Sequence, residues 1–285
     1  MDLRPRRSAL FLPASNPKAI GKARDLEADV VILDLEDAVA PEAKDEARIA
    51  AVQAVKDGGF GRRELVIRVN GLDTAWGARD LEAVAAAGPD AVLVPKVSTC
   101  DDLRAYDAAL AAAPAGTRLW TMIETCAVLP VLPALAELQG STRLSAFVLG
   151  TNDLAKDMRA QIRPGRAPFL PVFTAAICAA RANGLVVIDG VCNEFRDSEV
   201  VRREAEQGRE FGFDGKSLIH PDQIAPVNAV FTPSAAEIAM AEAIVAAFAD
   251  PANAGKGAIR VEGKMAELLH LDQARRTLAI AAAIA

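Results

Sequence analysis

Short runs of apolar, mostly β-branched residues alternate along most of the chain with longer alanine-rich runs that carry polar residues at helical spacing. The short runs are apolar throughout, which is typical of strands that are buried on both faces of a parallel sheet. We expect eight such strands, at residues 8–12, 29–33, 64–69, 91–94, 118–123, 145–149, 186–188 and 215–219.

The longer runs between these strands are expected to be helices. Pro41 supports one of them, because proline is well tolerated in the first turn of a helix. After the sixth strand, a polar stretch with Pro164, Gly165 and Pro168 comes before the next helix. The expected helices are residues 17–27, 41–56, 74–87, 99–113, 128–139, 172–183, 198–211 and 222–231.

The regular alternation of strands and helices predicts a parallel sheet, and eight such units predict closure into a TIM (β/α)8 barrel over residues 1–232. No GxGxxG or P-loop motif follows any strand, so a nucleotide-binding open sheet is poorly supported. Residues 233–285 are expected to form a C-terminal extension of two helices around a short hairpin near 257–264, with Ser234 as the first N-cap. Because this extension follows a closed barrel, we expect it to pack on a neighbouring subunit.

Composition limits the choice of protein class without naming a function. The 285 residues are 52% hydrophobic and 25% charged, and so can bury a large core. A net charge of −6 does not resemble the basic stripe of a nucleic-acid-binding protein, so no such partner is expected. The four cysteines are scattered without a CxxC pair, as expected for free thiols in a reducing cytoplasm. We expect neither a leader sequence nor a membrane-spanning run, and therefore a cytoplasmic protein.

Polar side chains follow the expected strands at the points where the strands end. In a (β/α)8 barrel the carboxyl ends of all strands face one mouth, which holds the active site. Arg68 lies at the end of the third strand, and Glu124 and Asp153 follow the fifth and sixth. Arg68 and Glu124 come directly after apolar runs, where a charge needs a partner. Acidic residues at other strand ends, such as Asp34 and Asp189, are expected mainly to cap helices or form ion pairs.

The carboxylates of Glu124 and Asp153, completed by backbone or water oxygens, suit Mg²⁺, a hard cation that takes few protein ligands. The chain has two histidines, His220 and His270, and neither belongs to an HxxxH motif or a cysteine cluster. Zinc and catalysis by a His–Ser or His–Cys pair are therefore disfavoured, and His220 is expected to be structural. The residues thus favour a Mg²⁺ site at the barrel mouth.

Several motifs extend this interpretation across nearly the whole chain. They are VVILDLEDAVAPEAKDEAR (30–48), VIRVNGLDTAWGARDL (66–81), VLVPKV (92–97), MIET (122–125), LGTNDLA (149–155), IDGV (188–191) and GFDGKSLIHPDQI (212–224). Together, and in this order, they resemble the citrate lyase β-subunit family of the HpcH/HpaI aldolase/citrate lyase superfamily, which includes malyl-CoA and citramalyl-CoA lyases. The combination is highly specific, although any one of these motifs would be weak.

The resemblance implies a TIM barrel, Mg²⁺ and a substrate that is a β-hydroxyacyl thioester or a related acid. It implies that Arg68 contacts the substrate, that Glu124 binds the metal and lies against the substrate, and that Asp153 is the second metal ligand. In thioester-cleaving members an aspartate in the tail serves acid–base chemistry. Its position is Glu267 here, which is our candidate catalytic proton carrier.

Three positions depart from the family pattern. The PGN turn after the first strand reads PASN at residues 13–16, and the TED motif reads TND at residues 151–153. The third departure is Glu267 itself, which stands in place of aspartate. These changes preserve the expected reaction class and leave the particular substrate open.

The expected function is that of a Mg²⁺-dependent carbon–carbon lyase. It would cleave a citryl-, malyl- or citramalyl-CoA-like thioester into a 2-keto acid and an acyl thioester by retro-Claisen chemistry. Arg68 would supply fixed positive charge for the enolate oxygen or a substrate carboxylate. The acyl carrier is either CoA or a carrier protein, and the resemblance implies a homotrimer or a hexamer.

Other readings of the sequence stay open. One is a pyruvate-type aldolase that acts on free 2-keto acids without CoA. Another is a Schiff-base aldolase that uses Lys96 or Lys216, and a third is a weakly active or regulatory homologue that binds a thioester or a carrier protein. If the carrier is CoA, its diphosphate would find candidate cationic partners in Lys18, Lys22 and Arg7.

Overall fold

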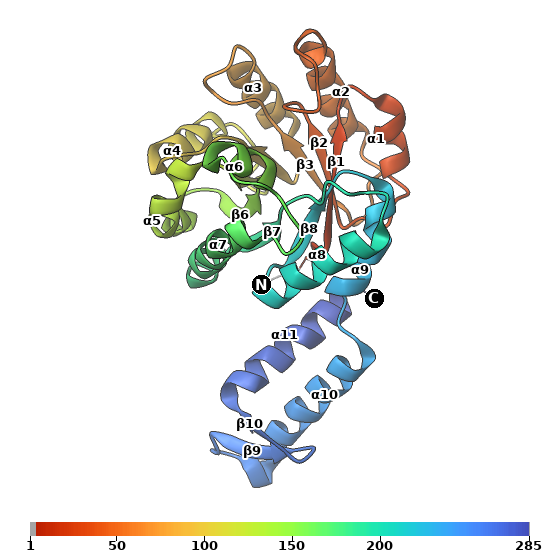
Figure 1. Ribbon diagram of the computed structural model, residues 1–285, viewed down its shortest axis with the longest axis vertical. Coiled ribbons are helices and arrows are strands. Elements are labelled where there is room, and N and C mark those ends of the chain that lie inside the picture. The colour runs from red at the N-terminus through yellow and green to blue at the C-terminus, as the bar shows by residue number, and fades with distance from the viewer. Residues whose placement is uncertain (1–3, 285) are drawn as a thin grey trace. The chain divides into compact units, whose positions relative to one another are not determined.

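Eight parallel strands close into a barrel within Arg6–Asn228, one of two compact units in the computed structural model, which describes residues 4–284 (Figure 1). Each strand pairs in parallel with the next, and β1 pairs with β8 to complete the ring. The strands are β1 (Ser8–Pro13), β2 (Val30–Asp34), β3 (Glu64–Arg68), β4 (Ala91–Val94), β5 (Arg118–Ile123), β6 (Leu144–Leu149), β7 (Val186–Asp189) and β8 (Gly215–Leu218). The predicted TIM barrel is confirmed.

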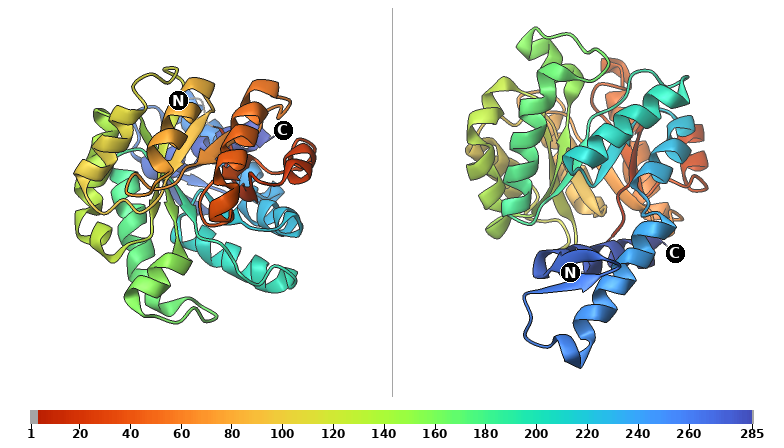
Figure 2. Two further views of the ribbon diagram at one scale, coloured as in Figure 1. Left: turned by 90° about the horizontal axis from the view of Figure 1, so that it is seen from above. Right: turned by 60° about the horizontal axis from the view of Figure 1, so that its bottom comes forward.

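Helices surround this barrel on its outer side (Figure 2, left). They are α1 (Pro17–Ala23), α2 (Lys44–Asp57), α3 (Gly77–Ala87), α4 (Cys100–Ala109), α5 (Leu132–Glu137), α6 (Thr151–Met158), α7 (Leu170–Ala182), α8 (Ser198–Phe211) and α9 (Ile224–Phe231). Short 3-10 turns precede or follow several of them, at Pro41–Ala43, Cys126–Val131, Leu138–Gly140, Ala167–Phe169 and Pro221–Gln223.

The helix expected at 128–139 is divided. Pro130 lies inside the 3-10 segment Cys126–Val131, and a second proline occupies the start of α5, so the regular α-helical part is only six residues long. The structure also contains α6, which the sequence analysis left within a polar stretch. This helix starts in the motif that carries Asp153, so the predicted site is at the N-terminus of a helix.

The barrel interior is packed with side chains from alternate strand positions. Its core includes Ile32, Val66, Leu93, Trp120 and Val148, all of them fully buried. At the end where the strands begin, Arg6 lies over the Trp120 ring, 5.4 Å from its centroid, and pairs with Glu64. This packing fills the barrel and leaves the chemistry to the opposite end.

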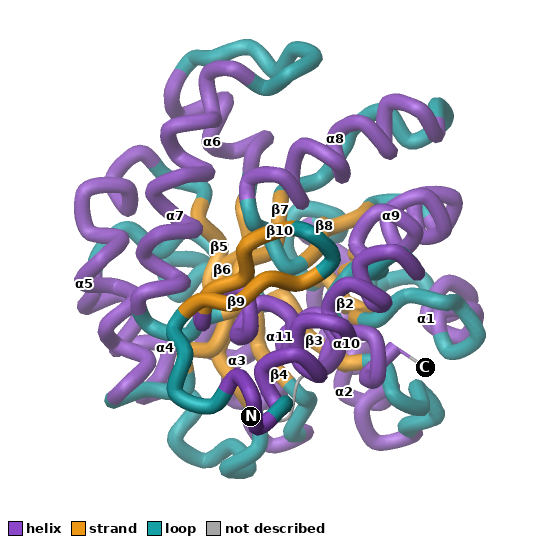
Figure 3. Tube along the Cα trace, turned by 90° about the horizontal axis from the view of Figure 1, so that it is seen from below, coloured by secondary structure: helices purple, strands orange, loops and turns teal. Residues whose placement is uncertain are grey.

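The second unit starts at Ala229 and also contains residues 4 and 5. It consists of α10 (Ala235–Ala249), the antiparallel hairpin of β9 (Ala258–Val261) and β10 (Lys264–Glu267), and α11 (Leu268–Ile284), as Figure 3 shows. Ser234 caps α10 in a capping box with Glu237, which confirms the predicted N-cap. Both strands of the hairpin were expected within 257–264, but β10 starts only at 264.

The hairpin turn explains this shift. Glu262 and Gly263 both have positive φ angles, 47° and 78°, as a two-residue hairpin turn of this hand requires. Their position at the turn makes Lys264 the first residue of the returning strand. Ile259, Val261 and Ala266 then face α10 in a small apolar cluster of their own.

One stretch, Pro221–Ala249, is apolar and long enough to be a candidate membrane span, with a mean hydropathy of 1.4, whereas no such run was expected. The α-helix in this stretch is interrupted at residues 232–234, which include Pro233, so that α9 has 8 residues and α10 has 15. At a rise of about 1.5 Å per residue, neither part alone spans a hydrocarbon core about 30 Å thick.

Candidate metal and substrate site

A cavity of about 280 Å³ opens at the carboxyl ends of the barrel strands, where the sequence analysis placed the site. Its walls combine charged residues with apolar and small ones, as is usual for a small-molecule site. The lining residues are Phe11, Asp34, Asp37, Ala38, Arg68, Met122, Leu149, Gly150, Thr151, Asn152, Asp153, Val191, Ser217 and Ile219. Two predicted site residues, Arg68 and Asp153, are therefore part of this wall.

Arg68, the last residue of β3, is held from one side by a carboxylate fork. Its Nε and Nη2 donate to the two oxygens of Asp34 at 2.6 and 2.7 Å, and its Nη1 lies 2.7 Å from an oxygen of Glu36. The guanidinium also lies over the ring of Phe11. Burial alone would lower the pKa of Arg68, but the charge and hydrogen bonds of Asp34 outweigh it and raise that pKa. Arg68 is thus a fixed, permanent cation.

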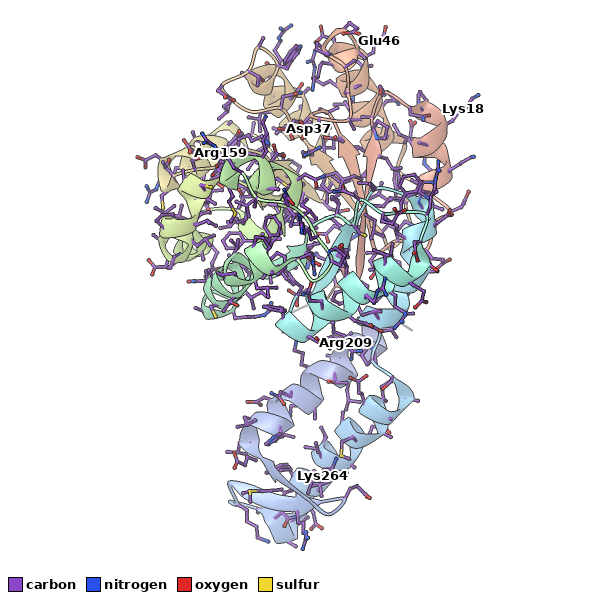
Figure 4. All side chains as sticks on the ribbon, viewed as in Figure 1. Lys18, Asp37, Glu46, Arg159, Arg209 and Lys264 are labelled. Carbon is purple, nitrogen blue, oxygen red and sulfur yellow. The ribbon has the colours of Figure 1, made fainter. Side chains whose placement is uncertain are left out.

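Asp34 has a structural role, as the sequence predicted, and that role bears on the site. It is fully buried at the end of β2, and besides Arg68 it accepts hydrogen bonds from the backbone N–H groups of Glu36 and Ala38. These bonds fix both the loop after β2 and the orientation of the guanidinium. Asp37, labelled in Figure 4, is mostly exposed and lies 3.5 Å from Nη1 of Arg68.

Glu36 is a functional candidate that the sequence analysis did not single out. Its largely buried side chain faces Arg68, and burial raises the pKa of its carboxyl to about 8, with the negative charge of Glu124 adding to the effect and Arg68 opposing it. Near neutral pH this carboxyl holds a proton beside the cavity. The run Asp34-Leu35-Glu36-Asp37 at a strand end was the available signal, but nothing in it says which carboxylate is buried.

Glu124 and Asp153 approach one cationic group. The ammonium nitrogen of Lys96 lies 3.4 Å from Oε1 of Glu124 and 2.7 Å from Oδ1 of Asp153. The backbone N–H of Lys96 also donates to Glu124 Oε1 at 2.8 Å. Lys96 has a positive φ of 54°, a conformation that costs free energy for a residue with a side chain and that recurs at functional sites. The pair that the sequence predicted does come together.

Burial and the neighbouring charges together shift the pKa values of Glu124 and Lys96. Burial raises the pKa of Glu124, and the charge of Lys96 partly offsets it. For Lys96, burial would lower the pKa, but the charge of Glu124 and the hydrogen bond to Asp153 raise it overall. The amine therefore stays protonated, which disfavours it as a Schiff-base nucleophile.

The second lysine considered for a Schiff base, Lys216, is fully buried on β8. Its ammonium group donates to Asp189 and to the backbone oxygen of Gly190, and it lies 3.3 Å from Glu204. Arg166 forms a second buried ion pair with the same Asp189. These contacts give Lys216 a structural role, as predicted for Asp189, and they leave the Schiff-base interpretation without support.

The residues present fit a divalent cation of the Mg²⁺ type. Glu124 and Asp153 already enclose a positive charge, and the buried Oε2 of Glu124 has no hydrogen-bond partner. Within residues 4–284 no three or more histidine, cysteine or acidic side chains cluster as metal ligands, so this site offers few protein ligands. Such a donor set suits a hard ion that keeps several waters.

Gly150 allows the two predicted ligands to lie together. A Cβ atom on Gly150 would stand 2.6 Å from both Cβ and Oε2 of Glu124, closer than real Cβ contacts come. The end of β6 therefore reaches Glu124 only because residue 150 has no side chain. One residue later, α6 begins and carries Asp153 in its first turn.

The remaining sequence candidates lie outside the cavity wall. His220 caps the turn Pro221–Gln223 and stacks on Phe195, with 4.9 Å between the ring centroids, in agreement with its expected structural role. Arg7, proposed for a diphosphate, instead binds Asp29 through its side chain and its backbone N–H, at the start of β1. That candidate was wrong, because β1 begins at the end of the barrel opposite to the mouth. Lys18 and Lys22 are exposed on α1.

Glu267 lies in the C-terminal unit, at the end of β10. Its backbone N–H donates to Nδ1 of His270 at 2.9 Å, and its side chain is half-buried. The role of Glu267 as a proton carrier stays a prediction from the sequence.

A closed (β/α)8 barrel with two converging carboxylates and an oriented arginine at its mouth defines the class of TIM-barrel enzymes, whose active sites lie at the carboxyl ends of the strands. The family model described as HpcH/HpaI aldolase/citrate lyase matches residues 7–221, and one described as a C–C bond lyase of the TIM-barrel fold matches residues 171–284. The chain belongs to the HpcH/HpaI aldolase/citrate lyase family. The expectations of this family and of a carbon–carbon lyase are confirmed.

Three similar proteins extend this result. A (3S)-malyl-CoA thioesterase of Cereibacter sphaeroides is 48% identical, over 99% of this chain and 96% of that protein. An L-malyl-CoA/beta-methylmalyl-CoA lyase of the same species is 34% identical, over 95% and 93% of the two chains. The crystal structure of CitE from Mycobacterium tuberculosis in complex with magnesium, acetoacetate and coenzyme A has a TM-score of 0.79 at 30% identity, and covers 98% of this chain and 100% of that one.

Proposed function

We propose that the protein cleaves the carbon–carbon bond of a 3-hydroxyacyl-CoA thioester of the malyl-CoA type, with Mg²⁺ as its cofactor. The observation that carries this proposal is the convergence of Glu124 and Asp153 on the ammonium group of Lys96, near the mouth where Asp34 holds the guanidinium of Arg68. Relatives named for malyl-CoA, and a neighbour bound to magnesium and coenzyme A, support both the substrate class and the cofactor.

The reaction needs charge control at two points. The hydroxyl of the substrate loses its proton as the adjacent carbon–carbon bond breaks, which yields a 2-keto acid and a thioester enolate. The enolate carbon then takes up a proton to give the acyl thioester. Mg²⁺, when bound by Glu124 and Asp153, acts as a Lewis acid that favours ionisation of the hydroxyl.

The chain's own residues supply orientation and proton handling. Arg68, held by Asp34, directs a fixed positive charge into the cavity, where it stabilises the enolate oxygen or a substrate carboxylate. Glu36 can take or give a proton near neutral pH beside Arg68. We propose that Glu267, supplied by the extension of a neighbouring copy, exchanges the proton with the enolate carbon.

A homo-oligomer, trimeric or hexameric, is part of this proposal. Met265, Leu268 and Leu269 expose 71%, 54% and 53% of their surface within the structure, at the end of the hairpin and the start of α11. Three large apolar side chains grouped in sequence next to Glu267 suit burial against another copy. Light scattering coupled to gel filtration tests this, and a monomer at micromolar concentration would contradict it.

A second candidate reaction is hydrolysis of the malyl-CoA thioester, because the thioesterase relative is 48% identical over 99% of this chain. Water would then attack the thioester carbonyl and release free CoA and the hydroxy acid. The metal-binding carboxylates and Arg68 would hold the same substrate in both reactions, so the site alone does not separate them.

Product analysis separates these reactions. Purified protein is incubated with (3S)-malyl-CoA and Mg²⁺, and glyoxylate is trapped with phenylhydrazine while free thiol is measured with a disulfide reagent. Carbon–carbon cleavage predicts glyoxylate and acetyl-CoA without free thiol, whereas hydrolysis predicts free thiol without glyoxylate. Turnover of 4-hydroxy-2-keto acids alone would favour the aldolase without CoA, and a failure to turn over any of these compounds would favour a regulatory homologue.

A further inference from the structure

Two asparagine side chains at the barrel mouth bind each other through both of their amide groups. Nδ2 of Asn152 donates to Oδ1 of Asn193 at 3.1 Å, and Nδ2 of Asn193 donates to Oδ1 of Asn152 at 2.8 Å. Asn152 is in the first turn of α6, directly before the predicted metal ligand Asp153, and Asn193 is in the loop between β7 and α8. The pair therefore joins the first turn of α6 to the loop after β7 at the mouth.

Close backbone packing fixes these loops beneath the pair. A Cβ atom on Gly190 would lie 2.7 Å from Oγ1 of Thr151, so the end of β7 and the start of α6 are in close contact. The buried Cys192 is also held in place, because its backbone oxygen accepts a hydrogen bond from Gln223 at 2.9 Å. The next residue, Asn193, then contacts Asn152.

The pair also fixes the direction in which Asn152 presents its side chain. Asn152 lines the cavity together with Asp153 and Arg68. Each amide uses one donor and one acceptor on the other, so rotating either amide breaks two hydrogen bonds. A carboxylate at either position would lose one of the two bonds, because a carboxylate only accepts. The result is an uncharged wall of defined position next to the metal-binding carboxylates.

We propose that Asn152 is a specificity-determining residue and that Asn193 is its positioning residue. The fixed amide limits the space beside Asp153, where the hydroxyl-bearing carbon of the substrate would lie, and so selects against a methyl group on that carbon. The inference rests on the proposed function, because it takes the metal-bound group to be the 2-keto acid part of the substrate. A single methyl group changes selectivity by roughly 10- to 200-fold in well-formed apolar pockets, which sets the scale for the effect of this wall.

Binding of two free keto acids tests this without turnover. Glyoxylate and pyruvate differ by one methyl group, and titration calorimetry in saturating Mg²⁺ gives the ratio of their affinities. We expect the wild type to prefer glyoxylate by about 10-fold or more. Asn152→Ala and Asn193→Ala should each reduce this preference at least 3-fold, and the double variant should reduce it no further than the stronger single one.

A merely structural role would weaken the binding of both acids equally, so the ratio distinguishes positioning from general damage. Asn183→Ala is the matched control, because it removes an asparagine amide that donates a hydrogen bond elsewhere, to the backbone oxygen of Ala179 in α7, and it should leave the ratio unchanged. An unchanged ratio in all three mouth variants would overturn the inference, as would single effects that multiply in the double variant.

A different experimental result would overturn the proposed function. If both acids bind in the presence of Mg²⁺ but no malyl-CoA-type thioester is turned over, the proposed function is overturned and the affinity ratio still tests the amide pair. If neither acid binds in a Mg²⁺-dependent manner, both are overturned.

Discussion

Arg68 donates two parallel hydrogen bonds to Asp34, at 2.6 and 2.7 Å. A carboxylate from the neighbouring strand thus orients the Arg68 guanidinium in the wall of the candidate site. The two residues lie opposite each other in the register of β2 and β3. Three of the five guanidinium N–H groups of Arg68 remain for other partners, and the two on Nη1 face Glu36 and Asp37. In the protonated form, Glu36 would compete weakly with an anionic substrate for that nitrogen.

Asp34→Asn should therefore impair activity through its effect on the orientation of Arg68. Asparagine cannot accept both guanidinium bonds, so Arg68 loses its orientation, and we expect kcat/KM to fall about 10²-fold. Loss of a buried carboxylate beside a buried arginine should also lower the free energy of unfolding by about 3 kcal/mol. Steady-state kinetics and urea unfolding measure the two effects. Asp37→Asn is the control, because Asp37 is exposed and 3.5 Å away, and a loss equal to that of Asp34→Asn would contradict the account.

The strand positions could be predicted because apolar runs buried on both faces have a clear sequence pattern. The barrel rule then placed Arg68, Glu124 and Asp153 on one mouth, and the structure agrees. Helix α6 was missed because its eight residues include three polar ones at the start of the site motif. A short helix stabilised mainly by its place at the mouth gives little periodicity to detect.

Other parts of the site depend on distances that no sequence pattern contains. Glu36 is largely buried whereas its neighbour Asp37 is exposed, and burial raises the pKa of Glu36. Lys96 adopts a positive φ, which the preferences of a single residue with a side chain oppose. The position of Glu267 relative to the barrel depends on long-range contacts within the chain or between copies. Local sequence patterns do not determine such contacts.

The raised pKa of Glu36 predicts a pH-dependent stability. The carboxyl has an ordinary pKa of 4.5 and one of about 8 in the folded protein, so between these pH values the native state holds a proton that the unfolded chain has released. The contribution of this group to stability is therefore fully present below about pH 4.5 and is lost as the pH rises towards 8. Glu36→Gln removes this dependence.

We accordingly expect Glu36→Gln to gain stability relative to the wild type between pH 5 and 8, by on the order of 3 kcal/mol. Urea unfolding at several pH values measures the difference, with Glu46→Gln, on the exposed face of α2, as the control (Figure 4). A difference between Glu36→Gln and the wild type that stays constant over this range would show that the carboxyl titrates normally.

Gly150→Ala should damage the metal site through packing alone. The added methyl group would meet Cβ and Oε2 of Glu124 at 2.6 Å, so the Glu124 side chain must leave its present position. We expect Mg²⁺ affinity to fall at least 10-fold and the free energy of unfolding to drop by about 1–3 kcal/mol. Gly140→Ala is the matched control, since nothing lies within 4 Å of its added Cβ. Equal Mg²⁺ affinities for the wild type and Gly150→Ala would refute this assignment of the space around Glu124.

The central claim is that Glu124 and Asp153 hold the catalytic Mg²⁺, and Asp153→Ala tests it most directly. The measurement is Mg²⁺-dependent turnover of (3S)-malyl-CoA by wild type and variant, together with their melting temperatures. We predict turnover by the wild type that EDTA abolishes and added Mg²⁺ restores. For Asp153→Ala we predict at least a 10³-fold loss of activity with folding intact, because the metal loses one of its two protein ligands. Normal, EDTA-sensitive turnover by the folded variant would contradict the account.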